Sequence, residues 1–395
     1  MSFALTLVLA MAAGAQGAGD VKSENAWLEI SAKNFEHNLR TLREQVLAKQ
    51  AGLCVVMKAD AYGHGIRLLI PSVIKAGIDT VCIADNNDAK AARDSGFTGR
   101  LIRIRAPAAG EVAAALPYAI EEIAGTWEGM RTISQVGVAN GRTMKVHLNL
   151  NSAGMGRGGL DLDTDEARRE ALDAVKLPGL QIVGIMTHFP DEDKAKIEEG
   201  LRVFLEQSAW LIKEAGLDRS KVTLHCANTA AAVLVPGSHL DMVRVGSLLY
   251  GQQPAESSVQ DIKPVMALKA RVASVHKFQK GDTVGYDRTF TLVRDSRLAN
   301  IPVGYSDGYY RAFSNRAQVL IGGRLFPLVG KVTMNTIMVD VTDAAGVEAG
   351  DEVVLLGTQG TEEITMSELM ADAYTFYGEF FVSIGNGNAK YLKAE

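Results

Sequence analysis

The chain has 395 residues, of which 22% are charged and 47% hydrophobic, proportions typical of a globular protein. This length exceeds that of an average domain, so we expect two domains or one large α/β unit. A net charge of -5 gives no indication of nucleic-acid binding, and no apolar run beyond the first twenty residues is long enough to cross a bilayer.

The first twenty residues differ from the rest of the chain. Residues 3–13 (FALTLVLAMAA) form a short apolar core that is followed by small residues. This pattern is typical of a secretory signal peptide and is too short for a transmembrane helix, although a basic leading segment is missing. A buried N-terminal helix is the alternative, but it fits poorly with the polar residues that follow at 20–25. We therefore expect residues 1–20 to be a signal peptide and the protein to be periplasmic.

Apolar strand patterns then alternate with helical patterns. The expected strands are 53–59, 80–85, 100–105, 121–126, 144–151, 180–189, 222–228 and 242–251. These runs are mostly uninterrupted, as expected for parallel strands that are buried on both faces. Helices are expected between them, for example at 89–95, 163–175 and 198–215. Eight such units predict a TIM barrel over residues 26–262. A doubly wound sheet is the alternative, but no Gly-x-Gly-x-x-Gly follows the first strand.

The pattern changes after Pro264. Alternating runs separated by glycines and polar turns predict a mainly-β domain over residues 263–395. The expected strands are 267–275, 282–291, 297–303, 318–328, 336–341 and 351–356. One helix is expected in this domain, at 363–377.

Cysteine and histidine residues give weaker signals. Three cysteines are too few for a disulfide framework. Cys54 and Cys82 lie in successive expected strands, so they could form a disulfide if those strands are neighbours, and buried free thiols are the alternative. Several histidines are not spaced with acidic residues as metal ligands are, and we interpret them as structural or as supports of the site. They are His64, His147, His225, His239 and His276.

The first barrel strand ends at a lysine. Residues 57–65 (MKADAYGHG) lie between an apolar run and a helical pattern that begins at Ile66. Burial lowers the pKa of a lysine, and the neutral amine can attack an aldehyde. Tyr62 could help to hold an anion, and the glycines allow a ligand to approach the backbone. For a single lysine the simpler interpretation is a side chain that reaches solvent from a strand end, so Lys58 alone does not decide the function.

The carboxyl ends of the last two barrel strands also carry suitable groups. In a TIM barrel, catalytic groups lie at these ends, and phosphate binds after the seventh and eighth strands. Asn228 and Thr229 follow the expected seventh strand, and Gly246 and Ser247 lie in the eighth. Such pairs are ordinary turn residues when taken alone. Their place in the expected barrel favours a phosphate site made of backbone amides and hydroxyl groups.

The whole 57–65 segment resembles the pyridoxal-phosphate lysine motif of the alanine racemase family, which implies that Lys58 carries this cofactor as a Schiff base. Similarity to the family extends from about Trp27 to the C-terminus. A Gly-Met-Gly-Arg segment ends at Arg157, a Thr-His-Phe segment is centred on His188, and a Met-Val-Arg segment ends at Arg244. Taken singly, each could be a loop or strand-end residue, and it is their combination that carries the resemblance.

The resemblance implies a role for each of these residues. Arg157 would contact the cofactor and the substrate, and Arg244 would face the pyridine nitrogen of the cofactor. An arginine there keeps the nitrogen neutral, whereas an aspartate would keep it protonated. A carbanion next to a neutral ring is less delocalised, which favours simple reprotonation at Cα over transamination. His188 and Arg244 would together help a tyrosine to act as a base.

That tyrosine is expected in the β domain, where Val-Gly-Tyr-Asp-Arg-Thr around Tyr286 resembles the family's catalytic tyrosine segment. Racemisation removes a proton from one face of Cα and returns one to the other, so two bases on opposite sides suffice. The resemblance implies that Lys58 serves the D-enantiomer and Tyr286 the L-enantiomer. In the family this tyrosine comes from the other subunit, which implies a homodimer.

Three differences from typical alanine racemases bear on the substrate. Asn149 stands where the family often carries a carbamylated lysine, so the charge opposite Arg157 has another source, such as a chloride ion; the following loop is also one residue longer. Met334 and Asn335 replace a methionine–aspartate pair near the substrate entrance. Residues 383–388 (SIGNGN), which include Asn386, replace a bulkier segment. These changes remove charge or bulk, as in the periplasmic broad-specificity members of the family.

We therefore expect a pyridoxal-phosphate-dependent racemase that accepts several amino acids, including basic and aliphatic ones. A dedicated alanine racemase is one alternative. A barrel-fold amino-acid decarboxylase is a second, although Arg244 does not suit it. A module that binds the cofactor without turnover is a third, and it would not need Tyr286.

Overall fold

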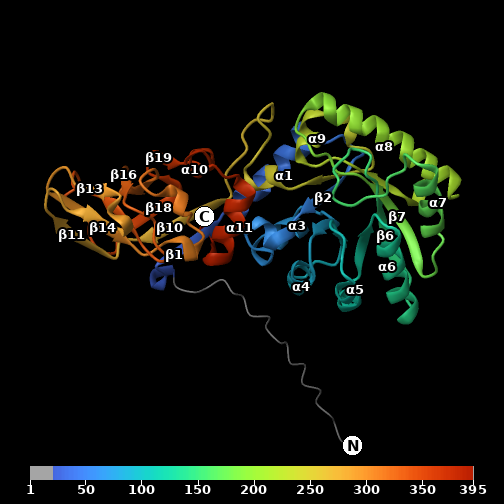
Figure 1. Cartoon of the computed structure of the whole chain (residues 1–395), viewed down its shortest axis with the longest axis horizontal. Helices are drawn as coiled ribbons and strands as arrows, with labels where there is room; N and C mark the ends of the chain where they lie inside the picture. Colours follow the sequence, from blue (N-terminus) through green and yellow to red (C-terminus); the bar gives the residue numbers. More distant parts are fainter. Residues whose placement is uncertain (1–20, 395) are drawn as a thin grey trace, which may run out of the picture.

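The structure, a computed structural model, describes residues 21–394, which form a helix-covered barrel beside a β-rich domain (Figure 1). The expected signal peptide, residues 1–20, lies outside the described residues. Among the helices of residues 21–394, none is both long and apolar enough to span a membrane.

Eight parallel strands form the barrel, as the sequence predicted. Their order is β8-β7-β6-β5-β4-β3-β2-β9. The first and last strands approach each other through two hydrogen bonds, from Asp241 N to Leu224 O (3.2 Å) and from Arg244 N to Ala227 O (2.9 Å), so the barrel nearly closes. The strands are β2 (Gly52–Val56), β3 (Thr80–Ile83), β4 (Arg100–Arg103), β5 (Ile120–Ala124), β6 (Met144–Asn149), β7 (Leu180–Met186), β8 (Thr223–His225) and β9 (Met242–Val245).

Helices cover the outside of this barrel (Figure 1). Several begin at a side chain that accepts a hydrogen bond from the first turn, as Asp85, Thr126 and Asp193 do, so the polar residues after each strand determine where the next helix starts. The three barrel helices named in the sequence analysis are confirmed. The helices are α1 (Ala32–Gln45), α3 (Ile66–Lys75), α4 (Asn86–Asp94), α5 (Ala109–Ala115), α6 (Trp127–Ala139), α7 (Asp165–Ala174), α8 (Lys194–Glu214) and α9 (Thr229–Leu234).

The second domain is mainly β, as expected. Its large sheet has the path β11-β14-β17-β16-β15-β18-β10-β1-β20, with β19 paired to β18, and β12 and β13 form a separate hairpin. Its strands are β10 (Met266–Arg271), β11 (Ser274–Phe278), β12 (Thr283–Val284), β13 (Phe290–Thr291), β14 (Ser296–Ile301), β15 (Gln318–Ile321), β16 (Arg324–Val329), β17 (Ile337–Asp340), β18 (Glu352–Gln359), β19 (Glu362–Ile364) and β20 (Ala389–Leu392).

Four expectations about this domain were wrong in detail. Two of them, the expected strands 267–275 and 282–291, divide into β10 and β11 and into β12 and β13. The expected strand 318–328 is two strands, because Gly322 and Gly323 take positive φ values of 58° and 73° and form the turn between β15 and β16. The single expected helix is two helices, α10 (Met366–Ala373) and α11 (Tyr377–Gly387). Helix α10 ends at Tyr374, whose left-handed backbone (φ 52°) turns the chain toward the second helix.

The chain enters the second domain before it enters the barrel. Strand β1 (Ala26–Ile30) pairs antiparallel with β10 and parallel with β20. This strand lies inside residues 26–262, the range expected for the barrel, yet it belongs to the sheet of the other domain. Trp27 of β1 is buried there under the guanidinium of Arg271, 5.0 Å from its ring. The chain therefore passes between the two domains twice, once after β1 and once before β10.

The disulfide between Cys54 and Cys82 is confirmed. It links the neighbouring strands β2 and β3, with 5.9 Å between the two Cα atoms. Cys226 is buried and free.

Candidate active site

Lys58 begins a left-handed turn at the carboxyl end of β2. This segment, α2 (Lys58–Tyr62), which we call the lysine turn, has four consecutive positive φ values between 53° and 58°, at residues 59–62. Residues other than glycine adopt this conformation at a cost of about 1–2 kcal/mol each. The surrounding structure therefore has to hold the turn in place.

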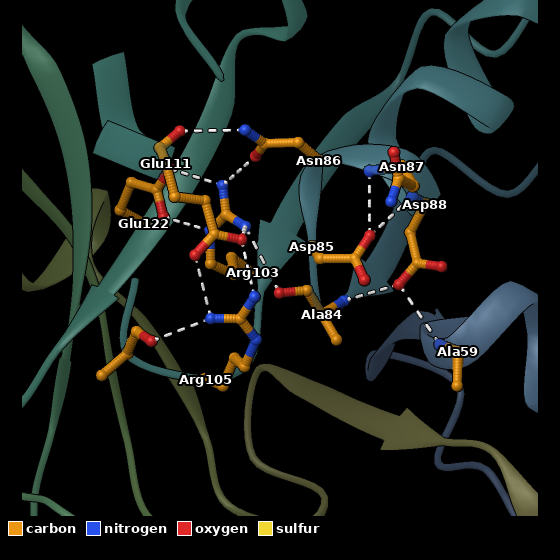
Figure 2. A network of polar contacts seen from close by, with 11 residues as sticks. Ala59, Ala84, Asp85, Asn86, Asn87, Asp88, Arg103, Arg105, Glu111 and Glu122 are labelled. Carbon is orange, nitrogen blue, oxygen red and sulfur yellow. Dashed lines mark hydrogen bonds and ion pairs between the residues drawn. The ribbon is translucent and has the colours of Figure 1, made fainter. Parts of the chain in front are cut away.

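A buried carboxylate provides much of that support. Asp88 Oδ1 accepts a hydrogen bond from Asp60 N (2.9 Å), and Oδ2 accepts from Ala59 N (3.2 Å) and Ala84 N (3.0 Å). Figure 2 shows this carboxylate between the lysine turn and Ala84, whose carbonyl in turn accepts from Arg103. Burial raises the pKa of Asp88, and the three amide donors oppose that rise. The turn is thus anchored to the loop that follows β3.

The second domain supports the same turn. Asp60 Oδ1 accepts from Ile66 N (2.8 Å), and Oδ2 pairs with Lys390 Nζ of β20 (2.8 Å). Gly385 of α11 packs directly on Gly63, since a Cβ atom at Gly385 would lie 2.4 Å from Gly63 Cα. The lysine turn therefore lies at the contact between the two domains.

The amine of Lys58 is surrounded by positive charge. Burial lowers the pKa of Lys58, and Arg157 and Arg244 lower it further. Its Nζ lies 5.7 Å from the centre of the Tyr62 ring, and no carboxylate in residues 21–394 forms an ion pair with it. These surroundings favour the neutral, nucleophilic amine.

Hydroxyl groups gather around Gly246 near the lysine turn. Gly246 N donates to Thr229 Oγ1 (3.2 Å), and a Cβ atom at Gly246 would lie only 2.6 Å from the Tyr62 hydroxyl. Ser247 is hydrogen-bonded to Tyr377, whose charge also acts on the pKa of Tyr62. We call Tyr62, Thr229, Gly246, Ser247 and Tyr377 the hydroxyl cluster. Neutral hydroxyl and amide groups gathered in this way suit a phosphate.

Asn228 follows β8 as expected, and its side chain is bonded within the protein. Its side chain caps α9 by accepting from Ala231 N (2.9 Å), and its amide donates to Phe189 O (3.4 Å). Asn228 therefore shapes the backbone before Thr229.

Arg244 is fully enclosed and holds its place through many acceptors. Its Nη1 donates to His225 O (2.7 Å) and His225 Nδ1 (3.0 Å). Its Nη2 donates to Thr187 O (2.9 Å), to Cys226 O (3.2 Å) and, at 3.4 Å, to His188 Nδ1. All four Nη hydrogens thus have protein acceptors in the described structure, which leaves the Nε–H available to a ligand. Because Arg244 only donates, His188 accepts at Nδ1 and carries its proton on Nε2.

Burial strongly affects His188 and Arg244. Burial, then Arg244, Arg157 and Lys58, lower the pKa of His188 to about 3, so this imidazole is neutral. Burial lowers the pKa of Arg244 to about 10, which still leaves it charged at neutral pH. Arg157, in contrast, is an exposed residue in a glycine-rich loop. Asn149 supports the base of that loop by donating to Gly158 O (2.5 Å).

Tyr286 lies apart from the barrel residues. It follows β12, and Figure 1 places the neighbouring strand β13 at the end of the second domain that faces away from the barrel. The residue is 69% exposed. Met334 is 55% exposed, and Asn335 donates to Ser306 Oγ (2.9 Å) in the same domain. One chain therefore brings together the barrel residues of the predicted site but does not bring Tyr286 to Lys58.

Several residues with clear contacts in this region were missed in the sequence. Tyr377 gave no signal because it stood at the end of an expected helix, and Asp88 resembled an ordinary helix-capping residue. His225 and His147 were interpreted as structural or supporting, and His225 binds Arg244 directly. An acidic residue and a histidine inside apolar strands, Glu121 and His147, were the signal that could have indicated a polar barrel interior.

Comparisons with known proteins agree over both domains. The model of the alanine racemase N-terminal domain matches residues 30–254, and that of the C-terminal domain matches residues 265–391. The broad specificity amino-acid racemase of Pseudomonas taetrolens is 51% identical over 95% of this chain and 91% of its own length. The lysine racemase of Proteus mirabilis is 42% identical over 93% of this chain and 89% of its own length.

Solved structures show the same architecture. The alanine racemase of Streptomyces coelicolor A3(2) has a TM-score of 0.85 and 29% identity, and the match covers 95% of this chain and 99% of that one. That of a D-cycloserine-producing Streptomyces lavendulae has a TM-score of 0.85 and 27% identity, over 94% and 97% of the two chains. Because family models match both domains and the relatives align over nearly the whole length, this chain belongs to the alanine racemase family.

Proposed function

We propose that this protein is a pyridoxal-phosphate-dependent racemase that interconverts the L- and D-forms of several amino acids. The observation that carries the proposal is the position of Lys58, whose amine lies among cations beside the hydroxyl cluster. The names of the relatives from Pseudomonas taetrolens and Proteus mirabilis support racemisation with a range that includes lysine.

The barrel residues fit this cofactor. Arg157 and Arg244 bring positive charge close to Lys58 without a carboxylate partner in the described structure, so a phosphate and an amino-acid carboxylate would balance the two arginines. When bound, the cofactor withdraws electrons and so makes the Cα–H bond of an amino acid acidic. Arg244 would hold the ring nitrogen of the cofactor through its free Nε–H, and a guanidinium would not transfer a full proton to that nitrogen. Lys58 accepts or returns the proton on the side that gives the D-enantiomer.

Tyr286 is the second base in this proposal, and it acts in the site of a partner subunit. Support comes from its exposure of 69%, with Tyr305 and Met334 of the same domain 45% and 55% exposed. Exposed aromatic and methionine side chains are enriched in protein interfaces. A second copy of the chain that covers this surface would carry Tyr286 to the site of the other subunit.

Mixing two inactive variants tests the shared site. Lys58→Ala and Tyr286→Phe, refolded together, should regain about a quarter of wild-type activity, because half of the dimers are mixed and each has one intact site. Each variant refolded alone is the control. Failure to regain activity, with mixed dimers present, would contradict the shared site, and full activity of Tyr286→Phe would contradict its role as a base.

A substrate panel tests the breadth. Initial rates on lysine, arginine, methionine and alanine should show racemisation of several of them. Activity confined to alanine would indicate a dedicated alanine racemase, and release of carbon dioxide from lysine or ornithine would indicate a decarboxylase. The absorbance band of the lysine-bound cofactor should be present in the wild type and lost in Lys58→Ala.

We also propose that the protein acts in the periplasm. The disulfide between Cys54 and Cys82 supports this, because disulfides persist in oxidising compartments. Cell fractionation followed by N-terminal sequencing tests the location and the removal of residues 1–20. Recovery in the cytoplasm with an intact N-terminus would contradict it.

A further inference from the structure

A continuous line of hydrogen bonds crosses the interior of the barrel and ends at Arg244. Glu121 Oε2 lies 3.0 Å from His147 Nε2, and His147 Nδ1 lies 2.8 Å from His225 Nε2. His225 Nδ1 lies 3.0 Å from Arg244 Nη1. We call these four residues the Glu121–Arg244 network. They come from β5, β6, β8 and β9, so the network exists only when the barrel is assembled.

The other end of the network reaches the protein surface. Glu121 pairs with Arg100 (2.8 Å) and Lys145 (3.4 Å), whose side chains are 35% and 54% exposed. Both cations lie near the starts of their strands, β4 and β6, and Arg244 faces the opposite end of the barrel. The network therefore links the amino-terminal end of the barrel to the candidate site.

Only one arrangement of protons satisfies every bond in the network. Arginine donates and cannot accept, so His225 Nδ1 is bare. A neutral imidazole carries one proton, which places the proton of His225 on Nε2, from where it donates to His147 Nδ1. The proton of His147 then lies on Nε2 and is donated to the carboxylate of Glu121. All three bonds point in the same direction, from Arg244 to Glu121.

The charges agree with this arrangement. Burial lowers the pKa of both histidines; around His225 the nearby His147 and Arg244 lower it further, and around His147 the Glu121 carboxylate only partly opposes the effect. Both rings are therefore neutral. Burial raises the pKa of Glu121, but hydrogen bonds from His147 and Arg100 outweigh it and bring the pKa to about 2. Glu121 is thus the ionised end of the network.

No carboxylate within residues 21–394 forms a hydrogen bond or an ion pair with Arg244. Each of its hydrogen-bond acceptors in the described structure is a carbonyl or an imidazole, and its side chain is buried. The carboxylate that it reaches through hydrogen bonds is Glu121, beyond two neutral rings. An unpaired buried charge is costly, so this connection stabilises the guanidinium where it stands.

We propose that Glu121 is a positioning residue for Arg244: through His147 and His225 it fixes one proton arrangement, so that His225 offers a bare Nδ1 to the guanidinium. The role of Arg244 beside the cofactor ring rests on the proposed function. The arrangement of protons in the network does not depend on that function. Glu121 touches neither substrate nor cofactor, and its effect on the reaction passes through the two histidines.

The unchanged protein gives the first test. In the purified full-length protein labelled with nitrogen-15 histidine, with and without pyridoxal phosphate, the 2.8 Å contact should appear as a coupling between the two ring nitrogens, His225 Nε2 as donor and His147 Nδ1 as acceptor. His147 Nε2 should also be protonated. The reverse donor, or a doubly protonated ring, would overturn the proposal. This readout does not depend on racemase activity.

Variants of Glu121 give the second test. Glu121→Leu leaves the His147 Nε2 proton without an acceptor, so His147 should populate both tautomers, and kcat should fall roughly tenfold, the loss that corresponds to about 1.4 kcal/mol. Glu121→Gln keeps a carbonyl acceptor and should restore the single tautomer and much of kcat.

The adjacent Glu122 is the matched control. It is also buried, but it faces the other side of β5 and pairs with Arg103 (2.7 Å) outside the network. Glu122→Gln should leave the two histidine tautomers as in the wild type, even if it lowers stability. An unchanged tautomer and kcat in Glu121→Leu would overturn the proposal, as would the same tautomer change in Glu122→Gln.

Discussion

At the scale of single residues, the site is defined by basic groups that form no ion pair with a carboxylate in the described part of the chain. Lys58, Arg157 and Arg244 influence one another closely enough to lower the pKa of the lysine. In water such a cluster would be screened, but Lys58 and Arg244 are largely withdrawn from solvent. The cluster therefore favours anionic ligands and a neutral amine at Lys58 together, which is the combination that attack on a phosphorylated aldehyde needs.

The hydroxyl cluster makes a prediction about Gly246. In Gly246→Ala the new Cβ would lie 2.6 Å from the Tyr62 hydroxyl, so this hydroxyl or the backbone has to move. We expect the affinity for pyridoxal phosphate to fall tenfold or more, about 1.4 kcal/mol, as measured by fluorescence titration. Gly237→Ala is the control, because its Cβ would meet only Leu201, at 3.8 Å. Equal affinities in the two variants would contradict this role of Gly246.

Buried neutral histidines predict how stability depends on pH. Burial lowers the pKa of His64 to about 4, and burial and nearby cations lower that of His188 to about 3. Between these values and about 6.5, the unfolded chain binds more protons than the folded one, so the stabilisation is present above that range and is lost as the pH falls. In this range, each histidine lowers the free energy of unfolding by up to about 1.4 kcal/mol for each unit by which the pH falls.

The measurement is the urea midpoint of the cofactor-free protein from pH 7.5 to pH 5 at constant ionic strength, which should stay nearly level down to about pH 6.5 and then fall. Asp88 and Glu122 act in the opposite direction, since burial raises their pKa. A midpoint that stays level or rises toward pH 5 would contradict the neutral state of the histidines.

At the scale of elements, the lysine turn is held by its neighbours. Its left-handed backbone is supported by the Asp88 carboxylate, the pair between Asp60 and Lys390, and the close contact of Gly63 with α11. The glycines of α11 therefore allow close backbone packing, because Gly385 lies against Gly63 and Gly387 lies against Asp307. This gives the 383–388 segment a structural role besides any effect on the substrate entrance, while Asn386 between them remains exposed.

Replacing glycine by alanine should have opposite effects on stability at two helical sites, Gly385 in α11 and Gly110 in α5. Gly385→Ala places a Cβ 2.4 Å from Gly63 Cα, so it should destabilise the protein by about 1–3 kcal/mol. Gly110→Ala in α5 meets nothing within 4 Å and should be neutral or stabilising by up to about 1 kcal/mol. Urea unfolding of both variants measures the difference. A stabilising Gly385→Ala would show that α11 does not pack as described.

At the scale of the whole molecule, the disulfide predicts the number of reactive thiols. The chain has three cysteines, and the Cys54–Cys82 bond leaves Cys226 as the free thiol. Denatured protein should titrate one thiol without reductant and three with it, and native protein should react slowly because Cys226 is buried. Equal counts with and without reductant would contradict the bond. Since the bond closes a loop of 28 residues, its removal should cost about 3–4 kcal/mol.

The sequence by itself determined the strand positions of the barrel, the mainly-β second domain and the lysine at the end of β2. These follow from local patterns: uninterrupted apolar runs for strands buried on both faces, alternation in the second domain, and a motif within nine neighbouring residues. The resemblance to the family implied that Arg157, His188 and Arg244 are site residues. The structure places them near Lys58.

Only the tertiary structure decided the pairing of β1 with the second domain, the left-handed lysine turn and the Glu121–Arg244 network. Each depends on groups that meet from distant parts of the chain: β20 for β1, Asp88 and Lys390 for the turn, and four barrel strands for the network. No local sequence pattern indicates such long-range contacts. A strained backbone or a buried charge is stable only where residues distant in the sequence provide its partners.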